Sequence, residues 1–138
     1  RVKGKEFGPV TGRPRRCGWL DGVMLRYTAR INGMTGVALM LLDVLDEFET
    51  LQFCVGYELD GKIITHFPGD PVELERCKPV YQSLAGWRQS ISGITRYEDL
   101  PGEAREYVQF LEDFIQVPVR LISVGPGRDQ TILRKSMI

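Results

Sequence analysis

Apolar residues recur at helical spacing in two stretches of the chain. The first stretch predicts a helix over about 18–32 with one face buried, which the Asn32-Gly33 pair ends. The second predicts an amphipathic helix over 103–115, with Pro101 and Glu103 suited to its first turn. The apolar positions are Trp19, Leu20, Val23, Met24, Tyr27 and Ile31 in the first stretch, and Ala104, Tyr107, Val108, Leu111, Phe114 and Ile115 in the second.

Two unbroken apolar runs predict strands in the interior of a sheet. Residues 37–45 are apolar almost throughout, which is typical of a strand buried on both faces, and Asp43 ends the densest part of the run. Residues 119–124 form a similar run, which Gly125-Pro126-Gly127 ends. Strands of this kind are typical of parallel sheets.

A hairpin is predicted in the middle of the chain. Residues 51–59 form a strand, and the Asp60-Gly61 pair turns the chain back into 62–67. Residues 68–102 hold four of the eight prolines and predict loops and short turns. The alternation of helices and strands with one hairpin therefore predicts an α/β fold: a mixed, mainly parallel sheet with flanking helices.

Length and composition are those of one globular domain. The chain has 138 residues, 43% of them hydrophobic, which is enough to build a core. The longest unbroken apolar run, 37–42, is far too short to span a membrane. The chain opens on Arg1 without a charged and then apolar leader, so we expect no signal peptide and either a fragment or a processed terminus.

The charges balance overall but not locally. Eighteen basic and eighteen acidic residues cancel, so no global field attracts nucleic acid or membrane. Residues 1–16, which predict a loop, hold six basic side chains against the single acid Glu6, and they are a candidate anion site. Three cysteines, Cys17, Cys54 and Cys77, form no C-x-x-C pair, which favours reduced thiols in a cytosolic protein.

The basic loop contains the run Thr11-Gly12-Arg13-Pro14-Arg15-Arg16. A glycine lets the backbone approach an anion, and the planar guanidinium groups then pair with carboxylate or phosphate through two bonds at a time. Pro14 stiffens the loop and lowers the cost of ordering it. The alternative interpretation is a solvated basic loop without a ligand.

Two further candidates follow predicted strands. In open α/β sheets ligands gather at the carboxyl ends of strands, where Asp43 would stand. Its carboxylate could accept hydrogen bonds from N1–H and the exocyclic amine of guanine, a pair of donors that adenine lacks; the alternative is an acid that ends a strand. The segment 123–128, Ser-Val-Gly-Pro-Gly-Arg, offers backbone amides and a hydroxyl to a base or phosphate, or is simply a tight turn that needs glycine.

The sequence shows no clear motif for a catalytic histidine, a zinc site or a P-loop. His66 is the only histidine and has no evident partner, so we expect it to be structural. Three scattered cysteines and one histidine give no zinc spacing, and no G-x-x-x-x-G-K-[ST] run forms a P-loop. Trp19 and Trp87 are predicted to be packing residues.

Several short segments lie in order along the chain and together carry a resemblance. They are Gly4-Lys5-Glu6-Phe7-Gly8, Thr11-Gly12-Arg13-Pro14-Arg15-Arg16, Gly18-Trp19-Leu20-Asp21, Leu42-Asp43-Val44-Leu45-Asp46, Cys54-Val55-Gly56-Tyr57, Pro79-Val80-Tyr81, Gly86-Trp87, Val117-Pro118-Val119, and Ile122-Ser123-Val124-Gly125-Pro126-Gly127-Arg128. Taken in this order, they resemble the adenylosuccinate synthetase family, and the resemblance spans essentially all 138 residues.

The resemblance implies a reaction. GTP phosphorylates the 6-oxygen of IMP, and the amine of L-aspartate displaces that phosphate to give adenylosuccinate in AMP biosynthesis, with magnesium required. The chain would be the carboxy-terminal portion of a larger, P-loop-like α/β enzyme, cytoplasmic and homodimeric. The phosphate loop, the catalytic aspartate and histidine and the Mg²⁺ site would lie upstream of Arg1. The resemblance therefore implies no catalytic or metal-binding residue in this chain, and we expect the chain alone to be inactive.

Family positions carry over to two parts of the chain. In a substrate-binding region over 1–17, the loop Pro9–Arg15 would close on the substrates. Thr11 and Arg13 would lie near the aspartate carboxylates, Arg13 near the IMP ribose, and Arg15 between the aspartate and GTP sites. The substrate-binding residues implied are Val10, Thr11, Gly12, Arg13 and Arg15.

The remainder, 18–138, would be an α/β region with the guanine-binding elements. The GTP-binding residues implied are Arg15, Leu41, Leu42, Asp43, Ser123, Val124 and Gly125. Leu41 stands where the family commonly has a lysine, so the ammonium contact is lost while an aliphatic contact with the base remains possible.

Two other functions stay open at this point. The first is a free-standing guanine-nucleotide-binding or interaction module without catalysis. The second is a weak RNA binder that uses the basic loop, which the zero net charge and the lack of aromatic residues among Arg13–Arg16 disfavour.

Overall fold

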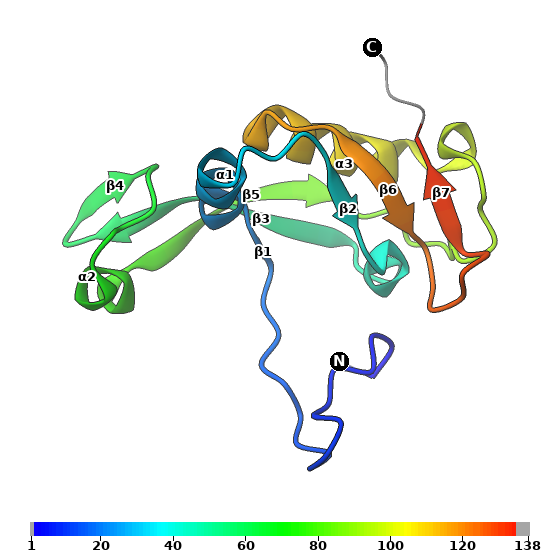
Figure 1. The fold of residues 1–138 in the computed structure, drawn as a ribbon, viewed down its shortest axis with the longest axis horizontal. Coiled ribbons are helices and arrows are strands. Elements are labelled where there is room, and N and C mark those ends of the chain that lie inside the picture. Colours follow the sequence, from blue (N-terminus) through cyan, green and yellow to red (C-terminus); the bar gives the residue numbers. More distant parts are fainter. Residues whose placement is uncertain (1, 135–138) are drawn as a thin grey trace.

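Two sheets organise the body of the protein in the computed structural model, which describes residues 2–134 (Figure 1). The larger sheet contains β1 (Leu20–Asp21), β3 (Thr50–Leu59), β4 (Lys62–Ile64) and β5 (Lys78–Ala85). In this sheet β3 pairs in parallel with β1 and antiparallel with β4 and β5. The predicted hairpin is confirmed, although its second strand, predicted over 62–67, ends at Ile64. Asp60 and Gly61 have φ angles of 51° and 79°, as a two-residue turn between β3 and β4 requires.

The smaller sheet contains β2 (Val37–Leu39), β6 (Val119–Ser123) and β7 (Thr131–Leu133). In it β6 is central, parallel to β2 and antiparallel to β7. Within the described residues β2 therefore pairs on one side only. The strand predicted over 119–124 is confirmed, whereas β7 was not predicted.

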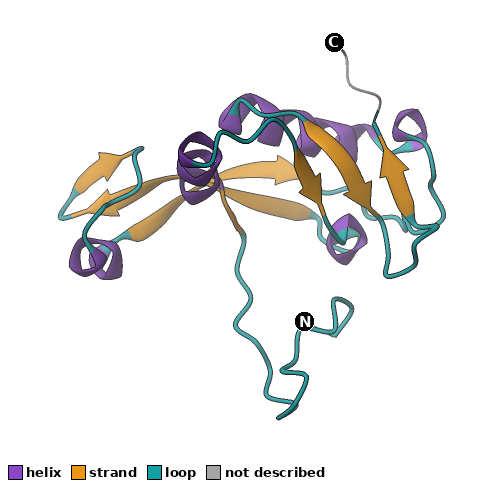
Figure 2. Cartoon of the chain, in the orientation of Figure 1, coloured by secondary structure: helices purple, strands orange, loops and turns teal. Residues whose placement is uncertain are grey.

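Three helices and two short 3₁₀ turns complete the body (Figure 2). They are α1 (Gly22–Ile31), α2 (Pro71–Arg76), α3 (Gly102–Ile115), η1 (Leu42–Leu45) and η2 (Tyr97–Asp99). The helix predicted over 103–115 is confirmed, with Ala104, Tyr107, Val108, Leu111 and Ile115 buried and Phe114 packed against the core. None of the helices within residues 2–134 is long and apolar enough to cross a membrane.

The two sheets share one core with α3. Phe53 of β3 is fully buried, and its ring packs edge-on against Phe110 and Phe114 at centroid distances of 5.1 and 5.3 Å. The same cluster continues to Ile122 of β6 and Ile132 of β7. A Cβ atom on Gly22 would lie 2.2 Å from the Phe53 ring, so the start of α1 can approach β3 only as glycine.

The α/β class and the mixed pairing are confirmed, but the expectation of mainly parallel pairing needs correction. Among the strands of residues 2–134, two pairs are parallel (β1–β3 and β2–β6) and three are antiparallel (β3–β4, β3–β5 and β6–β7). The reason lies in β5, a strand that the sequence did not suggest and that runs beside β3 along most of its length.

The helix predicted over 18–32 begins later and buries a different set of residues. Its first residue is Gly22, because Leu20 and Asp21 pair with β3 as β1. Asp21 is the N-cap, and its Oδ1 accepts a hydrogen bond from the Met24 amide at 3.0 Å. Gly22, Val23 and Ala29 are buried, whereas the predicted core positions Met24, Tyr27 and Ile31 are exposed.

The strand predicted over 37–45 is too long. β2 ends at Leu39, and the backbone of Leu41 turns into the left-handed region at φ 55° before η1 begins. β2 is not buried on both faces as predicted: Val37 and Leu39 are half-buried and Ala38 is exposed. Asp43 therefore lies in a 3₁₀ turn and does not end a strand.

The prediction of loops over 68–102 is wrong for two segments. Asp70 caps α2 by accepting the Val72 amide at 2.9 Å, and Pro71 is the first residue of that helix. Most residues of β5 are exposed, so no apolar alternation marked the strand in the sequence. Trp87, which follows β5, is buried as predicted.

Candidate nucleotide and substrate site

The carboxyl ends of β2 and β6 meet at one edge of the smaller sheet. The two strands are parallel with Leu39 opposite Ile122, so the residues that follow each strand emerge side by side. η1, which follows β2, packs against β6. The structure thus brings together two predicted sets: Leu41, Leu42 and Asp43 from one strand end, and Ser123, Val124 and Gly125 from the other. Because guanine is the ligand predicted for these six residues, we call them the guanine edge.

Asp43 carries an unsatisfied buried oxygen. The residue is 7% exposed, and its Oδ1 accepts no hydrogen bond from the described residues. An unpaired buried acceptor costs about 1–3 kcal/mol, and more when it is charged. Buried polar atoms in native proteins rarely lack a hydrogen-bond partner. We therefore expect a group outside residues 2–134 to donate a hydrogen bond to the Asp43 Oδ1.

The approach to Asp43 is strained. Leu41 has φ 55° and ψ 46°, a conformation that costs a non-glycine residue about 1–3 kcal/mol. This turn redirects the chain from β2 into η1 and places the Asp43 carboxylate at the sheet edge. The Leu41 side chain is half-buried and apolar, so it offers this edge a hydrophobic contact and no charge.

The second half of the guanine edge is held by hydrogen bonds. The Ser123 hydroxyl donates to the Gly125 carbonyl at 2.7 Å, and the Val124 amide donates to the Gln130 carbonyl at 2.9 Å. The Gln130 side chain donates to the Ser92 carbonyl and accepts from the Gly127 amide, both at 3.0 Å. A Cβ on Gly125 would lie 2.5 Å from the Gln130 amide group. Sequence reasoning missed Gln130, because no motif marked it.

Residues 2–17 form an exposed arm that hangs from the body on the same side as η1 (Figure 1). Within the arm, Phe7 and Pro14 form an antiparallel bridge, and the Gly8 amide donates to the Arg13 carbonyl at 2.8 Å. Gly12 has φ 65° at the tip, where glycine is favoured. The loop predicted over 1–16 is thus confirmed for its described part, 2–16.

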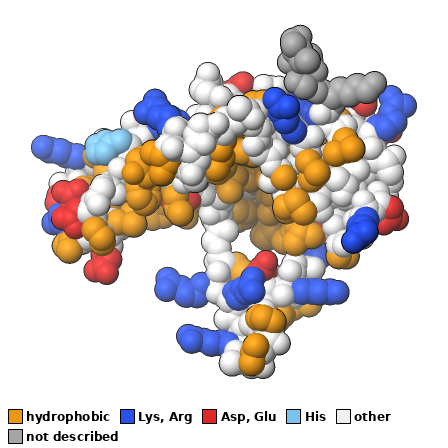
Figure 3. All heavy atoms as spheres, in the orientation of Figure 1, with side chains coloured by type: hydrophobic (Ala, Val, Ile, Leu, Met, Phe, Trp, Pro, Cys, Tyr) orange, Lys and Arg blue, Asp and Glu red, His pale blue; other side chains and the backbone are white. Residues whose placement is uncertain are grey.

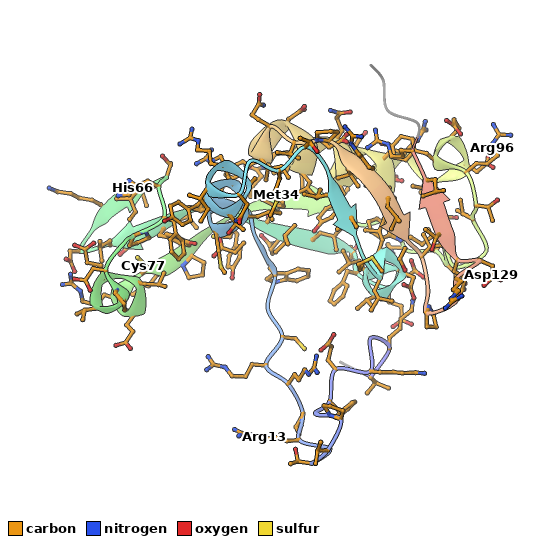
Figure 4. The ribbon with its side chains drawn as sticks, in the orientation of Figure 1. Arg13, Met34, His66, Cys77, Arg96 and Asp129 are labelled. Atoms are coloured by element: carbon orange, nitrogen blue, oxygen red, sulfur yellow. The ribbon has the colours of Figure 1, made fainter. Side chains whose placement is uncertain are left out.

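The substrate residues predicted on the arm face solvent. Val10 is 94% exposed, and Arg13 extends from the tip away from the body (Figure 4). Lysine and arginine side chains gather on this arm (Figure 3). Arg15 pairs with Glu6 at 3.2 Å, whereas Arg13 belongs to none of the ion pairs of residues 2–134. The structure therefore places the arm and the guanine edge on one side of the molecule (Figure 1).

The remaining candidates do not form a reactive centre. His66 is exposed in a loop after β4 (Figure 4). All three cysteines are free thiols, and burial raises the pKa of the Cys54 thiol, which disfavours the reactive thiolate. Burial and a 2.6 Å hydrogen bond to Asp21 hold the pKa of Tyr57 well above its usual range. Residues 2–134 contain no group of three or more His, Cys, Asp or Glu side chains that could hold a metal ion.

A shallow cavity of about 910 Å³ lies elsewhere. Its lining includes Pro118 and Val119 at the amino end of β6, which is the opposite edge from the guanine edge. Arg134 crosses this region, paired with Glu112 and stacked 4.2 Å above the Tyr97 ring. None of the predicted site residues lines this cavity.

The fold and the guanine edge define an α/β protein whose candidate ligand groups gather at the carboxyl ends of parallel strands, where such proteins bind ligands. A family model described as adenylosuccinate synthetase matches residues 1–132. The chain belongs to the adenylosuccinate synthetase family.

Individual relatives agree with this membership. The chain is 54% identical over 137 residues to the adenylosuccinate synthetase of Alkaliphilus metalliredigens, covering 99% of this chain and 32% of the relative. It is 51% identical over 133 residues to that of Geobacter sulfurreducens, covering 96% and 31%. The chain therefore spans about a third of the length of the curated relatives it matches.

A solved structure extends the likeness to three dimensions. The fully ligated adenylosuccinate synthetase of Plasmodium falciparum superimposes with a TM-score of 0.91 at 37% identity, covering 98% of this chain and 33% of that one. The resemblance predicted from the motifs is thus confirmed at the level of the family, and the α/β class at the level of the fold.

Proposed function

We propose that this chain is the carboxy-terminal third of a GTP-dependent ligase, an adenylosuccinate synthetase, that joins IMP and L-aspartate in purine biosynthesis. Family membership and the ligated structural neighbour support the reaction class. The order of the matching motifs supports the carboxy-terminal position. The share of the relatives that is covered, 32%, is equally compatible with an amino-terminal third, so the sequence adjoining residues 1 and 138 in the gene tests this part.

Within this proposal the guanine edge binds the base of GTP. The observation that carries it is the buried, unpaired Oδ1 of Asp43. Guanine presents N1–H and the exocyclic amine as adjacent donors, and bonds to a carboxylate are about twice as strong as neutral ones. Leu41 and Leu42 give the base apolar contacts, and the turn Ser123–Gly125 offers backbone groups to its other edge.

The arm supplies the second part of the proposal. Val10, Thr11, Gly12, Arg13 and Arg15 bind substrate when the arm closes, with Arg13 on the aspartate carboxylates and Arg15 also near GTP. The exposed guanidinium group of Arg13 supports this role, because it is free to form the paired hydrogen bonds that a carboxylate accepts.

The rest of the enzyme completes the reaction. We assign the catalytic residues and the Mg²⁺ ion to the parent's other two-thirds, because residues 2–134 contain no group of three or more His, Cys, Asp or Glu side chains that could hold a metal ion. The parent acts in the cytoplasm as a homodimer, without nucleic acid or membrane as a partner. In the parent, phosphoryl transfer depends on positioning and charge neutralisation, to which this chain contributes the nucleotide and aspartate contacts.

Nucleotide titration of the purified chain tests the guanine edge. We expect GTP to bind more tightly than ATP, because adenine presents no donor pair to Asp43, and we expect RNA not to compete. Equal affinity for GTP and ATP would contradict the assignment. The same sample should form no adenylosuccinate from IMP, aspartate and GTP, and measurable product would contradict the assignment of the catalytic groups to the rest of the parent.

The alternative is a free-standing guanine-nucleotide-binding or interaction module, which gives the same titration. The intact mass of the native gene product separates the two, since a module would have the mass of this chain and a ligase about three times as much.

A further inference from the structure

Asp46 is a buried carboxylate to which three parts of the chain donate. The residue is 3% exposed, and its Oδ1 accepts the Trp87 indole N–H at 2.8 Å. Its Oδ2 accepts the Ile91 amide at 3.4 Å and the Lys3 ammonium at 2.8 Å. Two of these donors belong to the body and one to the arm. The body therefore fixes Asp46, and Asp46 in turn holds the start of the arm.

The arm has few other attachments to the body. Its hydrogen bonds through Glu6, Phe7, Gly8 and Arg15 stay within the arm itself. Among the ion pairs of the described residues, Lys3–Asp46 is the one that joins the arm to the body. A Cβ on Gly4 would lie 3.4 Å from the Val44 side chain, so the backbone beside Lys3 also rests on η1.

The partner of Lys3 lies one turn from the guanine edge. The Asp46 amide donates to the Asp43 carbonyl at 3.2 Å and closes η1. One short 3₁₀ turn thus carries both the carboxylate proposed to bind guanine and the carboxylate that holds the arm. The other end of the arm enters the body at Trp19, whose ring packs 5.1 Å from that of Phe48.

We propose that Lys3 and Asp46 are positioning residues that seat the arm beside the guanine edge and so place Thr11, Arg13 and Arg15 for substrate. The proposal rests on the function proposed above. With this pair intact the arm is a loop anchored at both ends. Without it the segment between Lys3 and Trp19 loses its ion pair to the body at the Lys3 end, and more conformations become accessible to its tip.

The variant Lys3→Met tests the pair in the full-length protein. Lys3 is 39% exposed, so its loss leaves the core intact, and Asp46 keeps its bonds to Trp87 and Ile91. We expect the KM for aspartate to rise about 10- to 100-fold, the range in which small misplacements of substrate-binding groups cost rate. GTP affinity should change less than about twofold, because η1 stays in place. Lys3→Arg should restore the aspartate KM, because it keeps a positive charge opposite Asp46.

Trypsin provides a readout that does not depend on ligase activity. Arg15 and Arg16 lie in the arm, so cleavage after them reports how freely the arm moves, and mass spectrometry identifies the cut. We expect Lys3→Met to be cleaved about tenfold faster than the unaltered protein, since cleavage follows the population of the open form. Arg76→Met is the matched control, because it breaks a 3.1 Å ion pair with Asp60 at the far hairpin and should change neither cleavage nor kinetics.

The outcomes distinguish a failure of the role proposed for Lys3 and Asp46 from a failure of the proposed ligase function. Faster cleavage together with a raised aspartate KM supports the proposal. Unchanged cleavage overturns it, as does faster cleavage with unaltered aspartate kinetics, because then the pair holds the arm without placing substrate groups. If the unaltered full-length protein makes no adenylosuccinate, the proposed function is wrong. The cleavage rates would then still show whether Lys3 holds the arm.

Discussion

Asp43 and Arg13 are both proposed to contact ligand, yet the molecule holds them in opposite ways. Asp43 is 7% exposed and sits on a turn packed against β6, so its carboxylate is in place before any ligand arrives. Arg13 stands at the tip of an exposed arm whose one ion pair to the body, among the described residues, is ten residues away at Lys3. If both proposed roles hold, the comparison teaches that the base would meet a preformed site, whereas the second substrate would be contacted by an arm that has to close.

The largest expected effect is on the stability of the core that carries the Asp43 turn, compared with the stability contributed by the arm. Phe53→Ala removes a fully buried ring that packs against Phe110 and Phe114, and should lower the free energy of unfolding by about 3–5 kcal/mol. Phe7→Ala on the arm, where the ring is 39% exposed, should change it by less than about 0.5 kcal/mol. Urea denaturation of both variants measures the difference. Equal losses would show that the arm is as much a part of the folded core as β3.

Next in size is the loss of the arm's exposed guanidinium group. Arg13→Leu in the full-length protein removes a charge-assisted hydrogen bond of about 1.5–3 kcal/mol, so kcat/KM for aspartate should fall about 10- to 150-fold. Stability should stay unchanged, because Arg13 belongs to no ion pair of residues 2–134. Steady-state kinetics with varied aspartate give the result. Aspartate kinetics like those of the unaltered enzyme would refute the role of the arm.

The smallest of these effects should come from a substitution in the guanine edge. It should weaken GTP binding without lowering the stability of the free protein. Asp43→Asn presents an amide donor to the guanine donors, so GTP affinity should fall about 5- to 30-fold, which corresponds to about 1–2 kcal/mol. The change also removes a buried charge whose Oδ1 is unpaired, so the free protein should be equally or more stable. Calorimetric titration with GTP and thermal unfolding without ligand test the two halves. A loss of stability together with unchanged GTP affinity would mean that Asp43 is structural.

Strong periodicity made part of the fold predictable. The turn Asp60-Gly61 and the apolar face of α3 each specify one local structure, and both were confirmed. The end of β2 could not be predicted from the sequence, because Leu41 and Leu42 continue the apolar run. The backbone of Leu41 nevertheless adopts the left-handed helical conformation, which ends the extended segment. β5 was not predicted because most of its residues are exposed and show no apolar alternation. Its strand conformation is stabilised by hydrogen bonding to β3, which the local sequence does not reveal.

The site was predictable to the extent that its chemistry is local. Asp43 and the turn Ser123–Gly125 were identified from the residues themselves, although Asp43 was placed at the end of a strand instead of in η1. The Lys3–Asp46 pair joins residues 43 positions apart, and no motif links them. The same holds for Gln130, which reaches back 38 positions to Ser92. Contacts of this range follow from the topology, which only the folded structure reveals.

The single-sided pairing of β2 has a consequence for how this piece behaves in isolation. The backbone amides and carbonyls on its outer side form a ready template for any extended segment that can add to the sheet. In the parent proposed above, a strand from outside this chain would complete the ladder and shield the half-exposed apolar residues of β2. At high concentration without such a strand, two copies of the chain can join edge to edge, so production of the piece alone favours dilute conditions.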